Sequence, residues 1–150
     1  MHEYYNEIVV PEKIQTVFEF FNTPENLQEL MPSFMSFKLL TPGKLETKEG
    51  AVFDYIVKVF GIPNRWTTYI TDYDPPYSFA DIQLKGPNSY WHHVHTFKEV
   101  DNGTLVSDHI HYILPFGLIG KLGKAVVMGP LINSLFNHRS KVIKDKFGSV

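Results

Sequence analysis

The chain has 150 residues, 43% of them hydrophobic and 15% aromatic, which is enough for one folded unit with a sizeable core and too few for two. The formal net charge of −2 argues against nucleic acid as a partner, and the hydrophobic content argues against a disordered chain. The absence of cysteine excludes disulfide scaffolds, cysteine-ligated metals and thiol nucleophiles, and fits a reducing compartment. We therefore expect a single domain over residues 1–150, located in the cytoplasm.

The N-terminal part of the chain predicts one strand followed by two short helices. Residues 2–10 alternate weakly and end in an apolar run, which is typical of a strand. Pro11 is suited to the first turn of a helix, and the apolar residues that follow recur at helical spacing: Ile14, Val17, Phe18 and Phe21. A second short helix is expected over residues 24–31, because Pro32 stops it.

The remainder predicts six strands and a long terminal helix. Turn signals rich in Gly, Pro and Asn divide residues 34–114 at short intervals, which favours an antiparallel meander. After Pro115 the apolar residues follow a period near 3.6, and Gly129-Pro130 is expected to kink or break that helix. The predicted fold class is α+β: a curved antiparallel seven-stranded sheet wrapped around a long C-terminal helix, with a cavity between them.

Positive charge is concentrated in the predicted terminal helix. Residues 116–150 hold one acidic residue, Asp145, and six basic ones: Lys121, Lys124, Arg139, Lys141, Lys144 and Lys146. A solvated basic face is the first interpretation, and transient contact with an anionic membrane surface is the second.

Histidine is unevenly placed, since five of the seven histidines fall within twenty residues: His92, His93, His95, His109 and His111. Asn102-Gly103 is a strong hairpin signal. Pairing Asp101 with Thr104 sets Trp91 opposite Leu114, and likewise pairs His93 with Tyr112, His95 with Ile110 and Phe97 with Asp108. A three-residue loop would instead place His93 opposite His111 and His95 opposite His109. We prefer the first register, because it separates an inward aromatic face from an outward polar face carrying His92, His109 and His111.

The preceding strand is expected to place Asp81 beside His93 and Gln83 beside Trp91. The inward face then carries several polar side chains among aromatic ones, and their burial requires mutual hydrogen bonds. Three interpretations remain open at this point. The cluster is a self-satisfied buried network, the polar end of a ligand site, or a site of chemistry in which an Asp-His pair moves protons or His93 and His95 bind a metal.

The order of motifs resembles a small-domain branch of the SRPBCC superfamily, the START-related helix-grip proteins. The resemblance runs through Gly61-Ile62-Pro63-Asn64-Arg65-Trp66, Phe79-x-Asp81-x-Gln83, Trp91-x-His93-x-His95-x-Phe97 and Asp108-x-x-x-Tyr112-x-x-Pro115. It implies an apolar ligand held in a cavity, and the superfamily includes lipid-transfer proteins, quinone binders and polyketide cyclases or dehydratases.

We accordingly predict a protein that binds or transports a hydrophobic small molecule such as a lipid, a quinone or a polyketide-like compound. A cyclase or dehydratase is the alternative, with His93, Asp81 and Asp108 as candidate catalytic residues. Neither a cofactor nor a metal is expected. The predicted ligand-binding residues are Trp66, Phe79, Asp81, Gln83, Trp91, His93, His95, Asp108 and Tyr112.

Overall fold

The computed structural model describes residues 1–42, 46–113 and 118–148, with the backbone alone described for residues 118–129. Seven strands, two α-helices and a short 3₁₀ helix make up these parts of the chain. In order they are β1 (His2–Val10), α1 (Ile14–Asn22), η1 (Pro24–Leu27), β2 (Met35–Leu39), β3 (Val52–Val59), β4 (Ile62–Asp74), β5 (Ser78–Lys85), β6 (Tyr90–Val100), β7 (Gly103–Ile113) and α2 (Leu118–Phe147).

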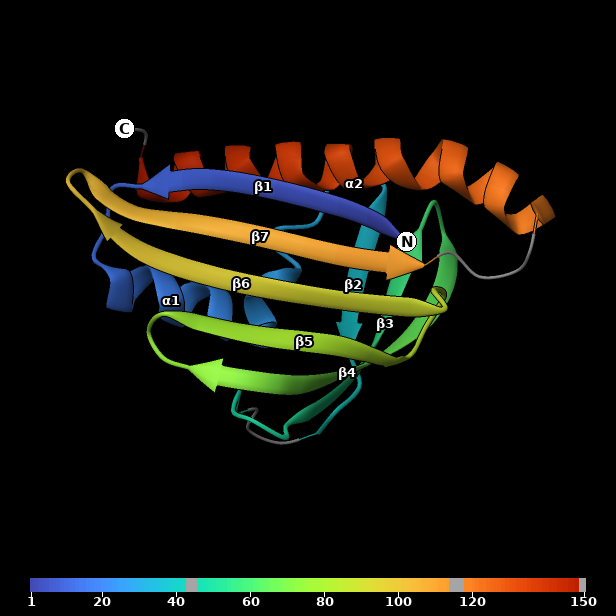
Figure 1. Cartoon of the computed structure of the whole chain (residues 1–150), viewed down its shortest axis with the longest axis horizontal. Helices are drawn as coiled ribbons and strands as arrows, with labels where there is room; N and C mark the ends of the chain where they lie inside the picture. Colours follow the sequence, from blue (N-terminus) through green and yellow to red (C-terminus); the bar gives the residue numbers. More distant parts are fainter. Residues whose placement is uncertain (43–45, 114–117, 149–150) are drawn as a thin grey trace.

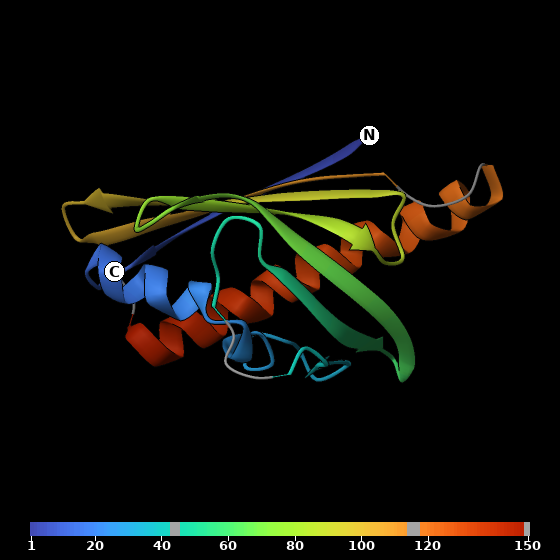
Figure 2. The ribbon, with the colours of Figure 1, turned by 90° about the horizontal axis from the view of Figure 1, so that it is seen from below.

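The strands form one antiparallel sheet in the order β1-β7-β6-β5-β4-β3-β2 (Figure 1). From β7 to β3 each strand pairs with the one before it in sequence, so β2 forms one edge of the sheet and β1, beside β7, forms the other. Figure 2 shows α2 lying against one face of this sheet, with β3 and β4 turning down beside it. The predicted helix-grip architecture is confirmed, because a seven-stranded sheet curves around a long C-terminal helix.

The helices differ from the prediction at their ends. Helix α1 begins at Ile14, and Pro11 precedes it. The second short helix is a 3₁₀ turn of four residues over Pro24–Leu27, instead of a helix over 24–31. Helix α2 continues through Pro130, so of the expected kink or break at Gly129-Pro130 the break is wrong. In the part of the chain that the structure describes, no helix is both long and apolar enough to cross a membrane.

The register of the β6–β7 hairpin is displaced by two residues from the preferred prediction. Val100 pairs with Gly103, which places His93 opposite Ile110 and His95 opposite Asp108. Gly103 has φ of +148°, and a Cβ there would overlap the carbonyl oxygen of Val10. Glycine is therefore needed where β7 starts against the end of β1, and not inside the turn.

The alternative with His93 opposite His111 and His95 opposite His109 is also wrong. A shift of two residues leaves each side chain on its predicted face, because side chains alternate along a strand. The predicted pairing of Asp81 with His93 is confirmed. Leu114, the expected partner of Trp91, lies outside the described residues, and Trp91 pairs with Tyr112.

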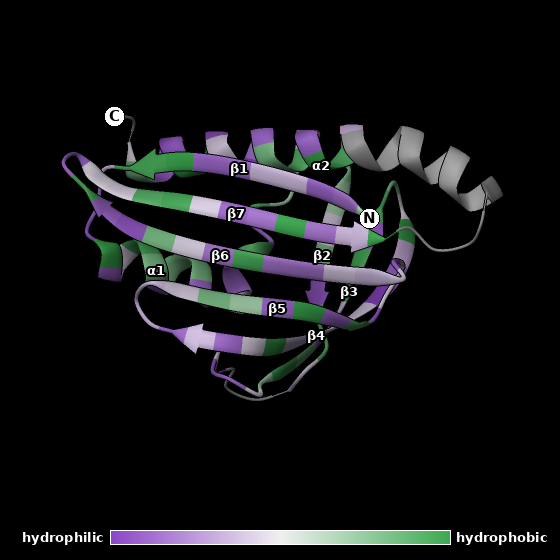
Figure 3. Cartoon of the chain, in the orientation of Figure 1, coloured by the Kyte–Doolittle hydropathy of each residue, from purple (hydrophilic) through white to green (hydrophobic). Residues whose placement is uncertain are grey.

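The concave face of the sheet carries two separate apolar clusters. The first lies around α1 and the end of α2, where the face is tightly packed, and includes Val17, Phe18, Phe79, Phe97, Val106 and Ile143. The second lies further back along α2 and includes Ile110, Tyr112, Ile132 and Phe136, with Tyr4 and Trp91 packed against it. Between them the strands carry polar side chains, and in Figure 3 the hydrophilic colour interrupts the apolar stretches of β6 and β7.

Candidate functional site

The centre of the concave face is organised around the carboxylate of Asp108 on β7. Its side chain is 1% exposed. The Oδ1 atom lies 2.8 Å from Nε2 of His93, 3.0 Å from Nη1 of Arg139 and 3.3 Å from Nδ1 of His95. One oxygen of a buried carboxylate therefore faces three nitrogen groups, which come from β6 and α2.

His95 connects this carboxylate to a second one. Its Nε2 lies 3.0 Å from Oδ2 of Asp81 on β5, while its Nδ1 faces Asp108. The Nδ1 contact is poorly aligned, and this buried atom has no hydrogen-bond partner among the described residues. The rings of His93 and His95 stack with centroids 3.7 Å apart, and Phe79 stacks on the other side of His95 at 4.1 Å. We define the polar belt as Asp81, His93, His95, Asp108 and Arg139.

Arg139 belongs to the belt, although its charge and its basic neighbours predict a solvated face. It is 8% exposed, and its guanidinium carbon lies 4.7 Å from the centroid of the Phe21 ring and 5.0 Å from that of Phe136. The helical spacing could have predicted this burial. Arg139 is three residues after Phe136 and four before Ile143, so it lies on the same buried face of α2.

The other basic residues of α2 are placed differently. Lys141, Lys144 and Lys146 are exposed, as a solvated face requires. Nζ of Lys146 lies 3.5 Å from Oε1 of Glu29. The side chains of Lys121 and Lys124 are outside the described part of the structure, and membrane contact through this helix stays a prediction.

The two histidines of the belt have pKa values shifted in opposite directions. Burial and the neighbouring His95 lower the pKa of His93. Burial also acts to lower the pKa of His95, but the carboxylates of Asp108 and Asp81 outweigh it and raise that pKa above its ordinary value. For Asp108, burial opposes ionisation, yet Arg139 and the two histidines hold its pKa well below the usual range. A single proton shared by the pair is therefore held by His95 in preference to His93.

This arrangement has a balanced charge. With His95 protonated, the carboxylates of Asp81 and Asp108 face two cations, His95 and Arg139. A neutral His93 that donates from Nε2 to Asp108 carries its lone pair on Nδ1, where it can accept a proton or a hydrogen bond. Ligating atoms of Asp81, His93 and His95 lie within 4.8 Å of one another, so these residues could hold a metal.

Aromatic side chains border the belt on the side away from α1. Trp91 contacts His93 edge-on with ring centroids 6.4 Å apart, and Trp66 on β4 meets Trp91 edge-on at 5.2 Å. Trp66, Trp91, His93 and His95 are half-buried, whereas Phe79 and Phe97 at the other end are 5% and 3% exposed. The Nε1 atom of Trp66 is buried without a hydrogen-bond partner among the described residues. Trp66 and Trp91 are therefore more exposed than Phe79 and Phe97, although the second apolar cluster beside them is itself buried.

Besides Trp66 and Trp91, three predicted site residues lie outside the hydrogen-bonded belt. Gln83 donates from Nε2 to the carbonyl oxygen of Asn88 at 2.6 Å and so closes the β5–β6 turn. Phe79 is part of the packed core beneath His95. Tyr112 packs in the second apolar cluster, 6.0 Å from Trp91 between ring centroids, with His2 stacked on it.

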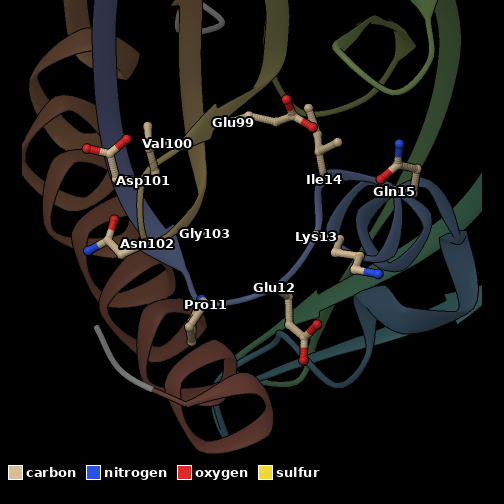
Figure 4. Close-up of a pocket in the computed structure, with 10 residues that line it drawn as sticks. All are labelled: Pro11, Glu12, Lys13, Ile14, Gln15, Glu99, Val100, Asp101, Asn102 and Gly103. Carbon is tan, nitrogen blue, oxygen red and sulfur yellow. The ribbon is translucent and has the colours of Figure 1, made fainter.

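A surface hollow of about 750 Å³ lies elsewhere, between the β6–β7 hairpin and the start of α1. Figure 4 shows its lining side chains, among them Glu12, Lys13, Glu99 and Asp101. They are mostly polar or charged, and none is a predicted site residue. The hollow is unsuited to an apolar ligand.

Comparison with known proteins identifies the fold. No family model matches the chain, and no curated protein matches its sequence. Among solved structures, the Zhui aromatase/cyclase from Streptomyces sp. R1128 superposes with a TM-score of 0.76 at 14% identity, covering 99% of both chains. The di-domain ARO/CYC StfQ from the steffimycin biosynthetic pathway superposes with a TM-score of 0.73 at 10% identity, and the match covers 97% of this chain and 50% of that one.

A protein of Thermus thermophilus gives a TM-score of 0.71 at 18% identity, covering 97% of this chain and 99% of that one. At these identities the likeness concerns the fold. The chain has a helix-grip fold, as these solved structures do.

The buried position of the Arg139–Asp108 pair leads to a prediction on stability. Arg139→Met should lower the free energy of unfolding by about 3 kcal/mol, because it leaves a buried carboxylate without its permanent cation. Arg65→Met is the matched control. Arg65 pairs with Asp54 but is 67% exposed, so its loss should leave the free energy of unfolding nearly unchanged. Urea unfolding measures both, and equal losses would contradict the assignment of Arg139 to the belt.

The opposite pKa shifts lead to a prediction on pH. In an NMR titration of the imidazole nitrogens, His95 should titrate above about 6.5 and His93 below it. Since folding raises the pKa of His95, its protonation stabilises the protein fully below the unfolded value of about 6.5, and this contribution is lost as pH rises through the raised pKa. Asp81→Asn removes one partner and should lower the pKa of His95. Coincident titrations of the two rings, or an unchanged pKa in the variant, would contradict this assignment.

Proposed function

We propose that this helix-grip protein binds a hydrophobic small molecule, such as a lipid, a quinone or a polyketide-like compound, against the concave face of its sheet. The observation that carries the proposal is the contrast along that face. One end is packed by the first apolar cluster, while the other combines the buried second cluster with the partly exposed rings of Trp66 and Trp91, which lie beside the polar belt. Apolar walls with a few convergent polar groups are the usual composition of small-molecule sites.

One buried polar atom supports the same location. Nε1 of Trp66 has no hydrogen-bond partner among the described residues, whereas Nδ1 of His95, which makes no aligned hydrogen bond, lies 3.3 Å from Oδ1 of Asp108. An unpaired buried polar group costs about 1–3 kcal/mol, and a polar group of a ligand or a water molecule would recover that cost. We place the polar end of the ligand at the belt and its apolar part along Trp66, Trp91 and Tyr112. A cytoplasmic location, suggested by the cysteine-free composition, belongs to this proposal.

The test uses intrinsic fluorescence, because Trp66 and Trp91 are the two tryptophans of the whole chain. A naphthoquinone and a quencher-labelled fatty acid should each be tested for saturable quenching of tryptophan emission. We expect at least one to bind, and His93→Ala to weaken that binding about tenfold, the equivalent of one hydrogen bond. His92→Ala is the matched control, since the neighbouring side chain points to the opposite face. Absence of saturable quenching by both probes, with no apolar compound extractable from the purified protein, would contradict the proposal.

A second candidate function is acid–base catalysis of the cyclase or dehydratase type on the same ligand. The specific observation in its favour is the stacked histidine pair, in which the pKa of His93 is lowered and the pKa of His95 is raised. His93 would take a proton from carbon next to a ligand carbonyl and return it to a departing hydroxyl group, which leaves as water. Asp108 would orient the ring, as paired carboxylates do for catalytic histidines. The aromatase/cyclases among the structural neighbours carry the same fold.

Turnover of a β-hydroxy ketone, followed by the absorbance of its conjugated enone product, tests this second function. We expect His93→Ala and Asp108→Asn each to lower the rate by about 10²–10⁴, the usual contribution of general acid–base catalysis. His92→Ala should retain the wild-type rate. If the variants at positions 93 and 108 turn the ketone over as fast as the wild type, or if the wild type gives no product, binding alone remains as the function.

A further inference from the structure

The outer face of the sheet carries a second cluster of histidine and carboxylate side chains. Glu3 on β1 pairs directly with His111 on β7, and His109 lies two residues along β7 on the same face. Nε2 of His111 lies 3.5 Å from Oε1 of Glu3, and Nε2 of His109 contacts the same oxygen. The ligating atoms of the three residues all lie within 4.8 Å of one another.

We propose that Glu3, His109 and His111 form a binding site for a divalent transition-metal ion, with Zn²⁺ as the fitting ion, across strands β1 and β7. Two imidazole nitrogens and one carboxylate oxygen are ligands that Zn²⁺ accepts at about 2.0–2.2 Å, with a fourth position left for water. The three ligating atoms lie within 4.8 Å of one another, so small side-chain movements would bring them to one ion. This site is separate from the polar belt and does not depend on the ligand proposed there.

The neighbouring side chains hold the two imidazole rings in place. Tyr5 meets the ring of His109 edge-on with centroids 5.6 Å apart, and His92 on β6 stacks with His111 at 6.5 Å. The rings of His109 and His111 are themselves 4.4 Å apart. Ligands that are oriented before binding lose less conformational freedom when the ion arrives.

The charge and exposure of the cluster also suit a metal cation. Hydrogen bonding to His109 lowers the pKa of Glu3, so its carboxylate is ionised at neutral pH. The side chains of Glu3, His109 and His111 are 59%, 38% and 33% exposed, which leaves the site open to ions from solution. Among the described residues, no arginine or lysine forms an ion pair with Glu3. In the polar belt, by contrast, Arg139 forms an ion pair with Asp108.

Calorimetric titration of tag-free protein with ZnCl₂ tests the proposal. We expect one ion per chain, and we expect Glu3→Gln, His109→Ala and His111→Ala each to weaken binding by more than the 10–100-fold typical of losing a residue that only orients a metal ligand. His138→Ala, which changes a histidine on α2, is the matched control and should bind as the wild type does. All three ligand positions are exposed or half-exposed, so the substitutions should leave the fold intact, as circular dichroism will verify.

Two further measurements separate this site from the polar belt. On addition of Zn²⁺ the imidazole nitrogen resonances of His109 and His111 should shift, while those of His93 and His95 should stay in place. Zn²⁺ should also raise the melting temperature of the wild type and leave that of the double variant His109→Ala/His111→Ala unchanged, because the ion joins two strands only in the folded state. Absence of Zn²⁺ binding, binding that survives all three substitutions, or shifts confined to His93 and His95 would each overturn the proposal.

Discussion

The buried carboxylate of Asp108 is the point on which the arrangement of sheet and helix depends. Its Oδ1 atom is contacted from β6 by His93 and from α2 by Arg139, and through His95 it is linked to Asp81 on β5. A buried charge is tolerated only when charged partners and hydrogen bonds compensate it. Those partners must therefore stay in place, which restricts how α2 can rotate or slide against the sheet.

This requirement also separates the two apolar clusters on the concave face. Phe136 and Ile143 on α2 belong to different clusters, and Arg139 lies between them. The cluster near α1 is closed by packed phenylalanines, while the other meets half-buried tryptophans. The polar belt thus lies between the two apolar clusters, and half-buried tryptophans lie beside it on one side. That boundary is where a ligand with one polar end would be oriented, and where a neutral histidine has both a base's lone pair and a carboxylate to orient it.

The inner and outer faces of β6 and β7 divide the histidines into two chemically different groups. His93 and His95 face buried carboxylates and an arginine, whereas His109 and His111 face one exposed glutamate on β1. The same residue type therefore serves charge compensation on one face and offers metal ligands on the other. The difference lies in whether a permanent cation is nearby, and among the described contacts Arg139 supplies one only on the concave side.

The amino-acid sequence was sufficient to predict the helix-grip architecture, the order of the elements and the faces of the five clustered histidines. These features depend on short-range patterns: alternation along strands, turn residues and the helical period after Pro115. Because side chains alternate with a period of two, the faces stayed correct even though the hairpin register was displaced by two residues.

Only the tertiary structure decided which polar groups meet. Arg139 lies far along the chain from Asp108, and nothing local distinguishes a buried arginine on α2 from the solvated lysines around it except its place in the apolar stripe. Gln83 was predicted for the site but closes a turn with Asn88, and Glu3 joins His109 and His111 through the pairing of the first and last strands. Such contacts depend on strand pairing and on the seating of α2, which are long-range outcomes of packing, and local sequence patterns do not encode them individually.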